Sequence, residues 1–199
     1  MSEILFPNEA AAWLSCSILL FALAVSAYID LRSMVIPKWI TVPLFFAGLV
    51  GNAIRGAWLG SLGVEVWSLP AGFGYGLVDG LLFGLAGAAS CFAILLILWA
   101  LRTCGGGDVK LFAAVGAWLG PWLGLYTFGV SLFVLVFFFT AAIIRKTATP
   151  HEVANEFKKS RSAAANARAP RLRVPYSLPI AVATLLVLVW AFRAELNLG

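Results

Sequence analysis

The sequence predicts an all-α polytopic membrane protein with six transmembrane helices in a single domain spanning residues 1–199. Of its residues, 62% are hydrophobic and only 12% are charged, whereas a soluble domain carries about 25% charged residues. The apolar runs are roughly 17–25 residues long, which suits a bilayer-crossing helix, and they lack the alternation of barrel strands. These observations exclude a soluble enzyme, a coiled coil and a disordered chain.

Three apolar runs are each long enough for one crossing: residues 10–29, 39–59 and 77–101. Residues 111–144 carry no charge and would form a helix of about 51 Å at 1.5 Å per residue, far longer than a hydrocarbon core of roughly 30 Å requires. The Gly120–Pro121 pair near the middle predicts a break. We therefore expect two short spans there, and the run at 176–192 completes six.

The basic residues predict the orientation of these spans. Twelve of the 14 Lys and Arg residues fall in the odd-numbered connections, and only Arg55 and Arg193 fall elsewhere. Basic connections stay in the cytoplasm, so both termini are expected outside and the basic loop 145–175 inside. A five-span arrangement would divide these connections between the two sides. The net charge of +5 thus indicates orientation in a lipid bilayer rather than a nucleic-acid partner.

The sequence predicts neither a metal site nor a cofactor. Cys16, Cys91 and Cys104 form no CxxC pair, so neither a zinc ribbon nor a disulfide framework is indicated. The single histidine, His151, lies in the basic loop without a cluster of further ligands.

Three aspartates lie at or within the predicted spans, namely Asp30, Asp79 and Asp108. A carboxylate at such a place is costly and marks a functional-site hypothesis. Asp30 ends the first span and Asp108 begins the fourth, so both are expected at the cytoplasmic membrane boundary, with Asp79 near the opposite side. Asp30 alone could be a helix-end residue beside Arg32, and Asp108 alone an N-cap. Together, two carboxylates at one depth favour a function.

Three glycines, Gly105, Gly106 and Gly107, directly precede Asp108. Such a segment can adopt positive φ and let another chain approach closely, so we expect Gly105 and Gly107 to need small side chains. Lys110 lies on another side of the same helix from Asp108, and its expected place is the membrane interface.

These motifs resemble those of the type IV prepilin peptidases. The segment GGGDVK at residues 105–110 is similar to the GxGDxK signature of that family. The segment YIDLR at 28–32, followed by an Ile-Pro pair that ends at Pro37, resembles its other aspartate motif. A VPY segment ending at Tyr176, with Pro179 after it, resembles the pattern before the last span of the family.

The resemblance implies a GxGD aspartyl protease-like bundle in a bacterial inner membrane. Asp30 and Asp108 would activate a water, and residues 105–107 would form the active-site loop, with Lys110, Pro37 and Tyr176 in supporting places. Two carboxylates about 5 Å apart at an effective dielectric of 20 repel by roughly 3 kcal/mol. Such a pair holds one proton near neutral pH and so offers one base and one acid.

The implied substrates are Flp-type prepilins and pseudopilins, precursors with a short basic leader followed by an apolar helix. Cleavage is expected at the leader boundary on the cytoplasmic face. Larger relatives carry a cysteine-containing region associated with methylation of the mature pilin, and the sequence is expected to represent the compact Flp/Tad-type form without it. Lys38 stands where the family commonly has Asn, so contacts near the first connection differ.

Two other classes remain open on the sequence. A small ion- or proton-coupled transporter could use Asp30, Asp79 and Asp108 as a relay, although midplane carboxylates and paired repeats, typical of transporters, are not evident. A non-catalytic membrane subunit of a pilus or secretion assembly would need the aspartates only as helix caps.

Overall fold

The computed structural model describes residues 9–33, 36–101, 104–147 and 176–192, and all regular secondary structure in these ranges is helical. Its helices in chain order are α1 (Glu9–Ser33), α2 (Lys38–Ser61), α3 (Phe73–Ala100), α4 (Gly106–Thr147) and α6 (Ser177–Phe192).

Among the described residues, α1 to α4 contain segments long and apolar enough to cross a membrane, and α6 is a shorter apolar helix. The predicted all-helical, multi-pass class is confirmed, while the count of six crossings stays a prediction. Most of the basic loop and both chain ends lie outside the described residues.

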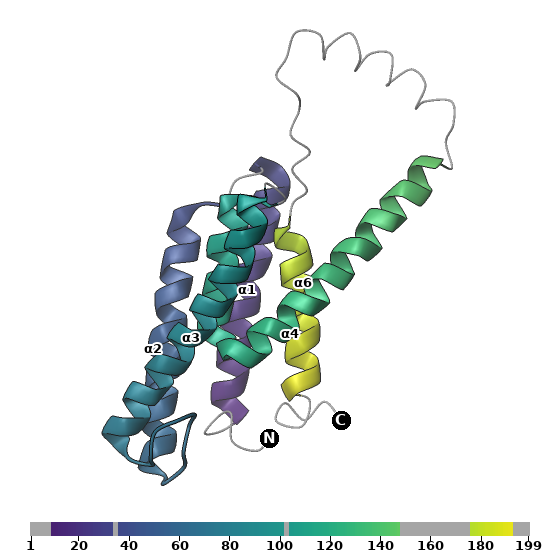
Figure 1. Ribbon diagram of the computed structural model, residues 1–199. Coiled ribbons are helices and arrows are strands. Elements are labelled where there is room, and N and C mark those ends of the chain that lie inside the picture. The colour runs from purple at the N-terminus through teal and green to yellow at the C-terminus, as the bar shows by residue number, and fades with distance from the viewer. Residues whose placement is uncertain (1–8, 34–35, 102–103, 148–175, 193–199) are drawn as a thin grey trace.

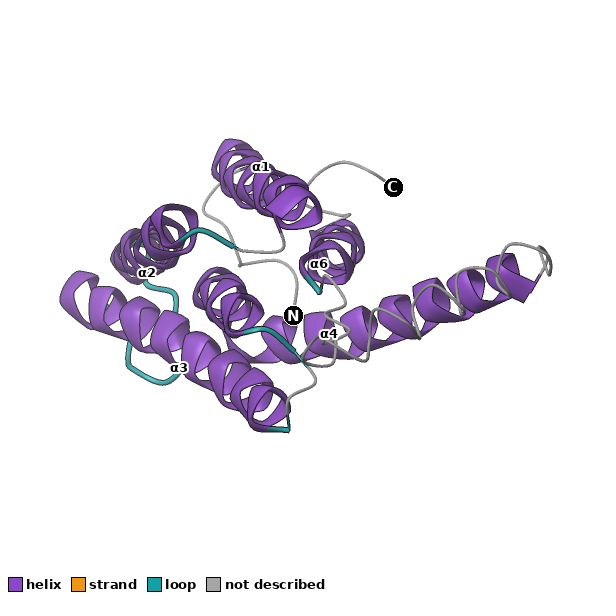
Figure 2. Ribbon diagram, turned by 90° about the horizontal axis from the view of Figure 1, so that it is seen from above, coloured by secondary structure: helices purple, strands orange, loops and turns teal. Residues whose placement is uncertain are grey.

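Helices α1, α2, α3 and α6 lie side by side in a bundle (Figures 1 and 2). Figure 1 shows that α1 and α3 end where α2, α4 and α6 begin, at the top of the view. Asp30 lies in the last residues of α1 and Asp108 in the first turn of α4, so we name this the aspartate end. The opposite end holds the finish of α2 and the start of α3 (Figure 1).

The core packs between α1, the first segment of α4, and α6. Leu19 and Leu23 of α1, Phe112 and Val115 of α4, and Ile180 of α6 are all fully buried in one apolar cluster. The outer faces instead present large apolar side chains, including Phe21, Trp39 and Phe133. Extensive exposed apolar surface marks contact with lipid or with another protein, as expected for a bundle whose outer faces meet the bilayer.

The break predicted within α4 is confirmed at Gly120. Its φ of 76° and ψ of −179° interrupt the helix in a region that glycine adopts without a steric penalty. The segment before it descends from the aspartate end, and residues 121–147 rise away at a slant (Figure 1). This change of direction divides a helix that would otherwise be too long for one crossing.

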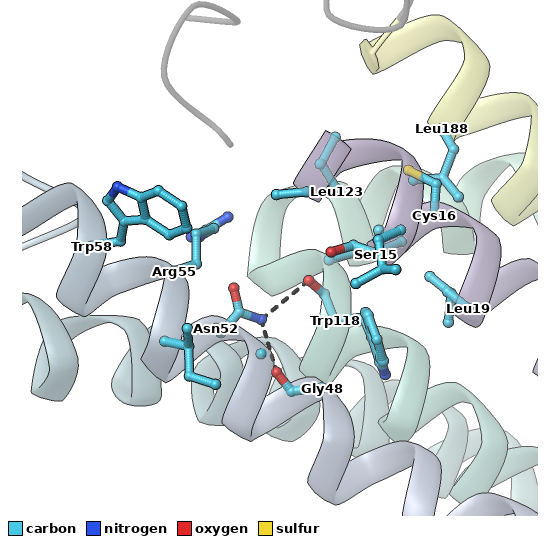
Figure 3. Close-up of a pocket in the computed structure, with 15 residues that line it drawn as sticks. Ser15, Cys16, Leu19, Gly48, Asn52, Arg55, Trp58, Trp118, Leu123 and Leu188 are labelled. Atoms are coloured by element: carbon cyan, nitrogen blue, oxygen red, sulfur yellow. Dashed lines mark hydrogen bonds between the residues drawn. The ribbon is translucent and has the colours of Figure 1, made fainter. Parts of the chain in front are cut away.

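Asn52 of α2 stabilises the break from the side. Pro121 has no N–H and so cannot bond to the carbonyl of Ala117, four residues earlier. The side-chain amide of Asn52 donates to the oxygen of Ala117 at 2.7 Å. The oxygens of Trp118 and Gly48 lie 3.2 and 3.3 Å from the same amide nitrogen (Figure 3). A buried carbonyl without a donor is costly. Asn52 supplies that donor and so lowers the free-energy cost of the break inside the bundle.

Helices α2 and α3 contact each other through glycines. A Cβ atom on Gly56 would collide with the carbonyl oxygen of Gly76, and one on Gly80 with the carbonyl oxygen of Asn52. In membrane proteins small residues let helix backbones approach this closely. The interface therefore leaves no room for a methyl group unless the helices separate.

We predict that Gly56→Ala lowers the free energy of unfolding by about 1–3 kcal/mol, because the added methyl overpacks the contact with α3. The matched control is Gly51→Ala on the same helix, where an added Cβ meets nothing within 4 Å. Both changes carry the same helix-propensity gain of about 1 kcal/mol, so their difference isolates the packing. Thermal unfolding in detergent measures it, and equal midpoints would contradict the close contact.

Candidate active site

Asp30 is held by a residue from the other end of the sequence. The Ser177 hydroxyl, at the start of α6, donates a hydrogen bond to Asp30 Oδ2 at 2.5 Å across a separation of 147 residues. The Asp30 side chain is only 6% exposed and Ser177 is fully buried. The guanidinium of Arg32 lies over the ring of Tyr28, 4.8 Å from its centroid. Asp30 is thus a buried carboxylate bonded to α6, rather than a solvated helix-end residue.

Asp108 is the third residue of α4 and is also 6% exposed. Its Oδ2 accepts the backbone N–H of Gly105 at 3.1 Å, while its own N–H donates to the carbonyl of Gly105 at 3.1 Å. Gly105 is therefore the N-cap, and the interpretation of Asp108 as an N-cap is wrong by three positions. Its bond corresponds to the N3 half of a capping box. This geometry leaves Asp108 Oδ1 outside that bond.

Two of the three glycines before Asp108, Gly105 and Gly107, are explained by space and not by backbone conformation. Positive φ occurs at none of Gly105, Gly106 and Gly107, so that part of the expectation is wrong. A Cβ on Gly107 would lie 3.2 Å from Cβ of Ile36, and one on Gly105 would lie 3.1 Å from Asp108 Oδ2. The missing side chain of Gly107 thus lets the start of α4 pack against Ile36, just before α2.

Tyr176 contacts the slanted part of α4 and belongs to the same buried cluster as Val109, the residue after Asp108. Its hydroxyl lies 2.9 Å from Oγ of Ser131, and both groups are buried. Tyr176 and Ser177 are consecutive, so the start of α6 is bonded to the slanted part of α4 on one side and to Asp30 of α1 on the other.

Ser131 and Ser177 form hydrogen bonds at the candidate site but are not among the site residues predicted from the sequence. Ser177 had a usable signal, since it is a polar residue in the first turn of an apolar helix, directly after Tyr176. Ser131 lies in the middle of an apolar run, and no feature of the sequence around it indicates a role at the site. Of the predicted supporting residues, half-buried Pro37 precedes α2 with an extended backbone, and Lys110 is exposed.

Asp79 does not join the other two aspartates. It lies at the start of α3, at the end of the bundle away from Asp30 and Asp108 (Figure 1). Its fully buried carboxylate accepts the N–H of Trp67 at 2.6 Å, and the N–H and hydroxyl of Ser68 at 3.0 and 2.9 Å. These bonds fasten the connection between α2 and α3, which is a structural role.

Cys104 lies beside the glycines but does not supply a thiolate. Burial raises the pKa of its thiol to about 11, and the negative charge of Asp108 adds to the shift. The thiol is therefore protonated near neutral pH, and a protonated thiol is a poor nucleophile. No three His, Cys, Asp or Glu side chains in the described ranges are grouped as a metal site would require.

A cavity of about 230 Å³ lies away from the aspartates, between α1, α2, α4 and α6 (Figure 3). Ser15, Asn52 and Arg55 contribute its polar atoms, and leucines such as Leu123 and Leu188 its apolar wall. The Asn52 amide is occupied by the carbonyls at the break of α4. The cavity therefore lies beside the break in α4, and none of its lining residues belongs to the aspartate end.

Comparison with known proteins places this geometry in context. The sequence profile described as the type IV leader peptidase family matches residues 17–144, a range that includes Asp30 and Asp108. A protein of Aeromonas hydrophila named prepilin leader peptidase/N-methyltransferase is 32% identical over 123 residues, which cover 56% of this chain and 34% of that protein. A Klebsiella pneumoniae protein of the same name is 32% identical over 109 residues, covering 52% and 39%.

The chain thus spans roughly a third of the length of these curated relatives. No solved structure matches it significantly. The profile covers more than half of the chain and agrees with the resemblance of the two aspartate motifs. The chain belongs to the type IV leader peptidase family.

Proposed function

We propose that the chain is a prepilin peptidase, an aspartyl endopeptidase whose catalytic residues are Asp30 and Asp108. The observation that carries the proposal is the burial of these two carboxylates, from separate helices, at one end of the bundle, with Asp30 bonded to the start of α6. Both aspartates lie within the range matched by the family profile. The relatives are named prepilin leader peptidases.

Two carboxylates that hold one proton suffice for peptide hydrolysis. The ionised carboxylate removes a proton from water as the water oxygen attacks the scissile carbonyl carbon, and the protonated one gives its proton to the carbonyl oxygen. Collapse of the tetrahedral intermediate transfers a proton to the amide nitrogen and breaks the C–N bond.

The proposed substrates are Flp-type prepilins and pseudopilins in a bacterial inner membrane. The aspartate end is proposed to face the cytoplasm, with both termini outside and the basic loop inside. A precursor with a short basic leader and an apolar helix would bring its leader boundary to that depth. A glycine before the scissile bond suits this place, because glycine resists helix formation by about 1 kcal/mol relative to alanine and keeps the chain extended.

We predict that Asp30→Asn and Asp108→Asn each lower the cleavage rate of such a precursor by about 10²–10⁴-fold, because an amide performs neither acid nor base catalysis. The assay uses the purified full chain in liposomes with EDTA present, and mass spectrometry identifies the new N-terminus. Folding of each variant is checked by thermal unfolding.

The matched control for these variants is Asp79→Asn, which changes a buried aspartate outside the proposed site. It should weaken the bonds to Trp67 and Ser68 and lower stability by about 1–3 kcal/mol while retaining cleavage. Wild-type rates in Asp30→Asn or Asp108→Asn would refute the proposal. Loss of cleavage in all three variants with folding retained would show that the effect is not specific to Asp30 and Asp108.

The proposed orientation can be tested at the two ends of α2. In a variant without native cysteines, Leu62→Cys should react with a membrane-impermeant maleimide added to spheroplasts, and Lys38→Cys should react only after permeabilisation. Both positions are exposed, and they lie at opposite ends of one helix. The reverse labelling pattern would place the aspartate end outside.

We expect Gly107→Val to lower turnover by about tenfold, because overpacking against Ile36 costs about 1–3 kcal/mol and displaces the start of α4. Gly106→Ala is the control, since its added Cβ meets only Trp99, at 3.5 Å, an ordinary contact. Combining Gly107→Val with Ile36→Ala should restore part of the rate. Equal turnover in the two single variants would show that packing against Ile36 does not position Asp108.

A further inference from the structure

Ser177 occupies a place from which its hydroxyl can reach another helix. Side-chain hydroxyls within helices commonly bond to the carbonyl four residues earlier. Three buried residues in the described helices do so at 2.8 Å: Ser26, Thr127 and Thr184. Ser177 is the first residue of α6, so no residue of this helix lies four positions before it. Its hydroxyl donates to Asp30 Oδ2 instead.

We propose that Ser177 is a positioning residue that orients the carboxylate of Asp30 for catalysis. A hydroxyl bonded to Oδ2 restricts rotation of the carboxylate and directs Oδ1 away from that bond. Hydrogen bonds to an ionised acceptor are shorter and stronger than those between neutral groups. Ser177 thus selects the orientation in which Asp30 works with Asp108. This inference rests on the proposed peptidase function.

A second hydrogen bond, made by the preceding residue Tyr176, holds the start of α6 in place. The hydroxyl of Ser131 donates to the carbonyl of Phe128 at 2.7 Å, so its single hydrogen is used there. In the 2.9 Å bond between Ser131 and Tyr176, the donor is therefore the phenol of Tyr176. This bond ties the residue before Ser177 to the slanted segment of α4. The position of Asp30 accordingly depends on α6 and α4 as well as on α1.

The test compares three single variants in the liposome cleavage assay. Ser177→Ala should lower kcat by about tenfold or more with KM changed less than about twofold, since orientation affects the transition state and not substrate binding. Ser177→Thr, which keeps a hydroxyl, should recover much of kcat. Thr184→Val removes another buried hydroxyl of α6, bonded only within its helix, and should leave kcat within about twofold.

Wild-type kcat in Ser177→Ala would overturn the inference, as would an equal loss of kcat in Thr184→Val. If Ser177→Ala does not fold, Ser177→Cys replaces it, because the thiol fills the volume but is a weak donor; wild-type kcat in that variant also overturns the inference. These results differ from failure of the proposed function, which would appear as a wild-type protein that cleaves no precursor.

Discussion

Two carboxylates buried at one end of an apolar bundle are the constraint on which the rest of the structure depends. A polar or charged group removed from water is costly unless the protein supplies hydrogen bonds. Asp108 receives one from Gly105, in the turn before its own helix. Asp30 receives one from Ser177, at the far end of the sequence. Completion of the site therefore requires the start of α6 to lie against the end of α1.

The place of that start depends in turn on the break in α4. Positive φ at Gly120 redirects the helix, so that Ser131, eleven residues later, meets Tyr176. Asn52 compensates the carbonyl that the following proline leaves without a donor. The break, the hydrogen bond from Asn52 and the bond between Ser131 and Tyr176 therefore depend on one another. A change at the break would reach Asp30 through α6.

Much of this organisation is predictable because its signals are local in sequence. Hydropathy predicts the membrane helices, and the Gly120–Pro121 pair predicts the break. Asp30 and Asp108 stand out because carboxylates are rare at helix ends in a membrane. The bond between Ser177 and Asp30 was not predictable, since it joins residues 147 positions apart and depends on how α1 packs against α6. The sequence predicts a small residue at Gly107 for backbone freedom and for close approach of another chain. The neighbour that requires it, Ile36, depends on how the helices pack and is not predictable from the sequence.

Proximity of Asp30 and Asp108 is the central claim, and cross-linking measures it most directly. In a variant without native cysteines, Asp30→Cys combined with Asp108→Cys should be joined rapidly by the shortest bifunctional thiol reagents. The control pairs Asp30→Cys with Asp79→Cys, whose helix position is at the other end of the bundle, and it should remain unlinked. Digestion between the two helices followed by mass spectrometry measures the linked fraction. Rapid linkage of the first pair alone is the predicted result. Equal linkage of both pairs, or none in the first, would contradict a site that contains both aspartates.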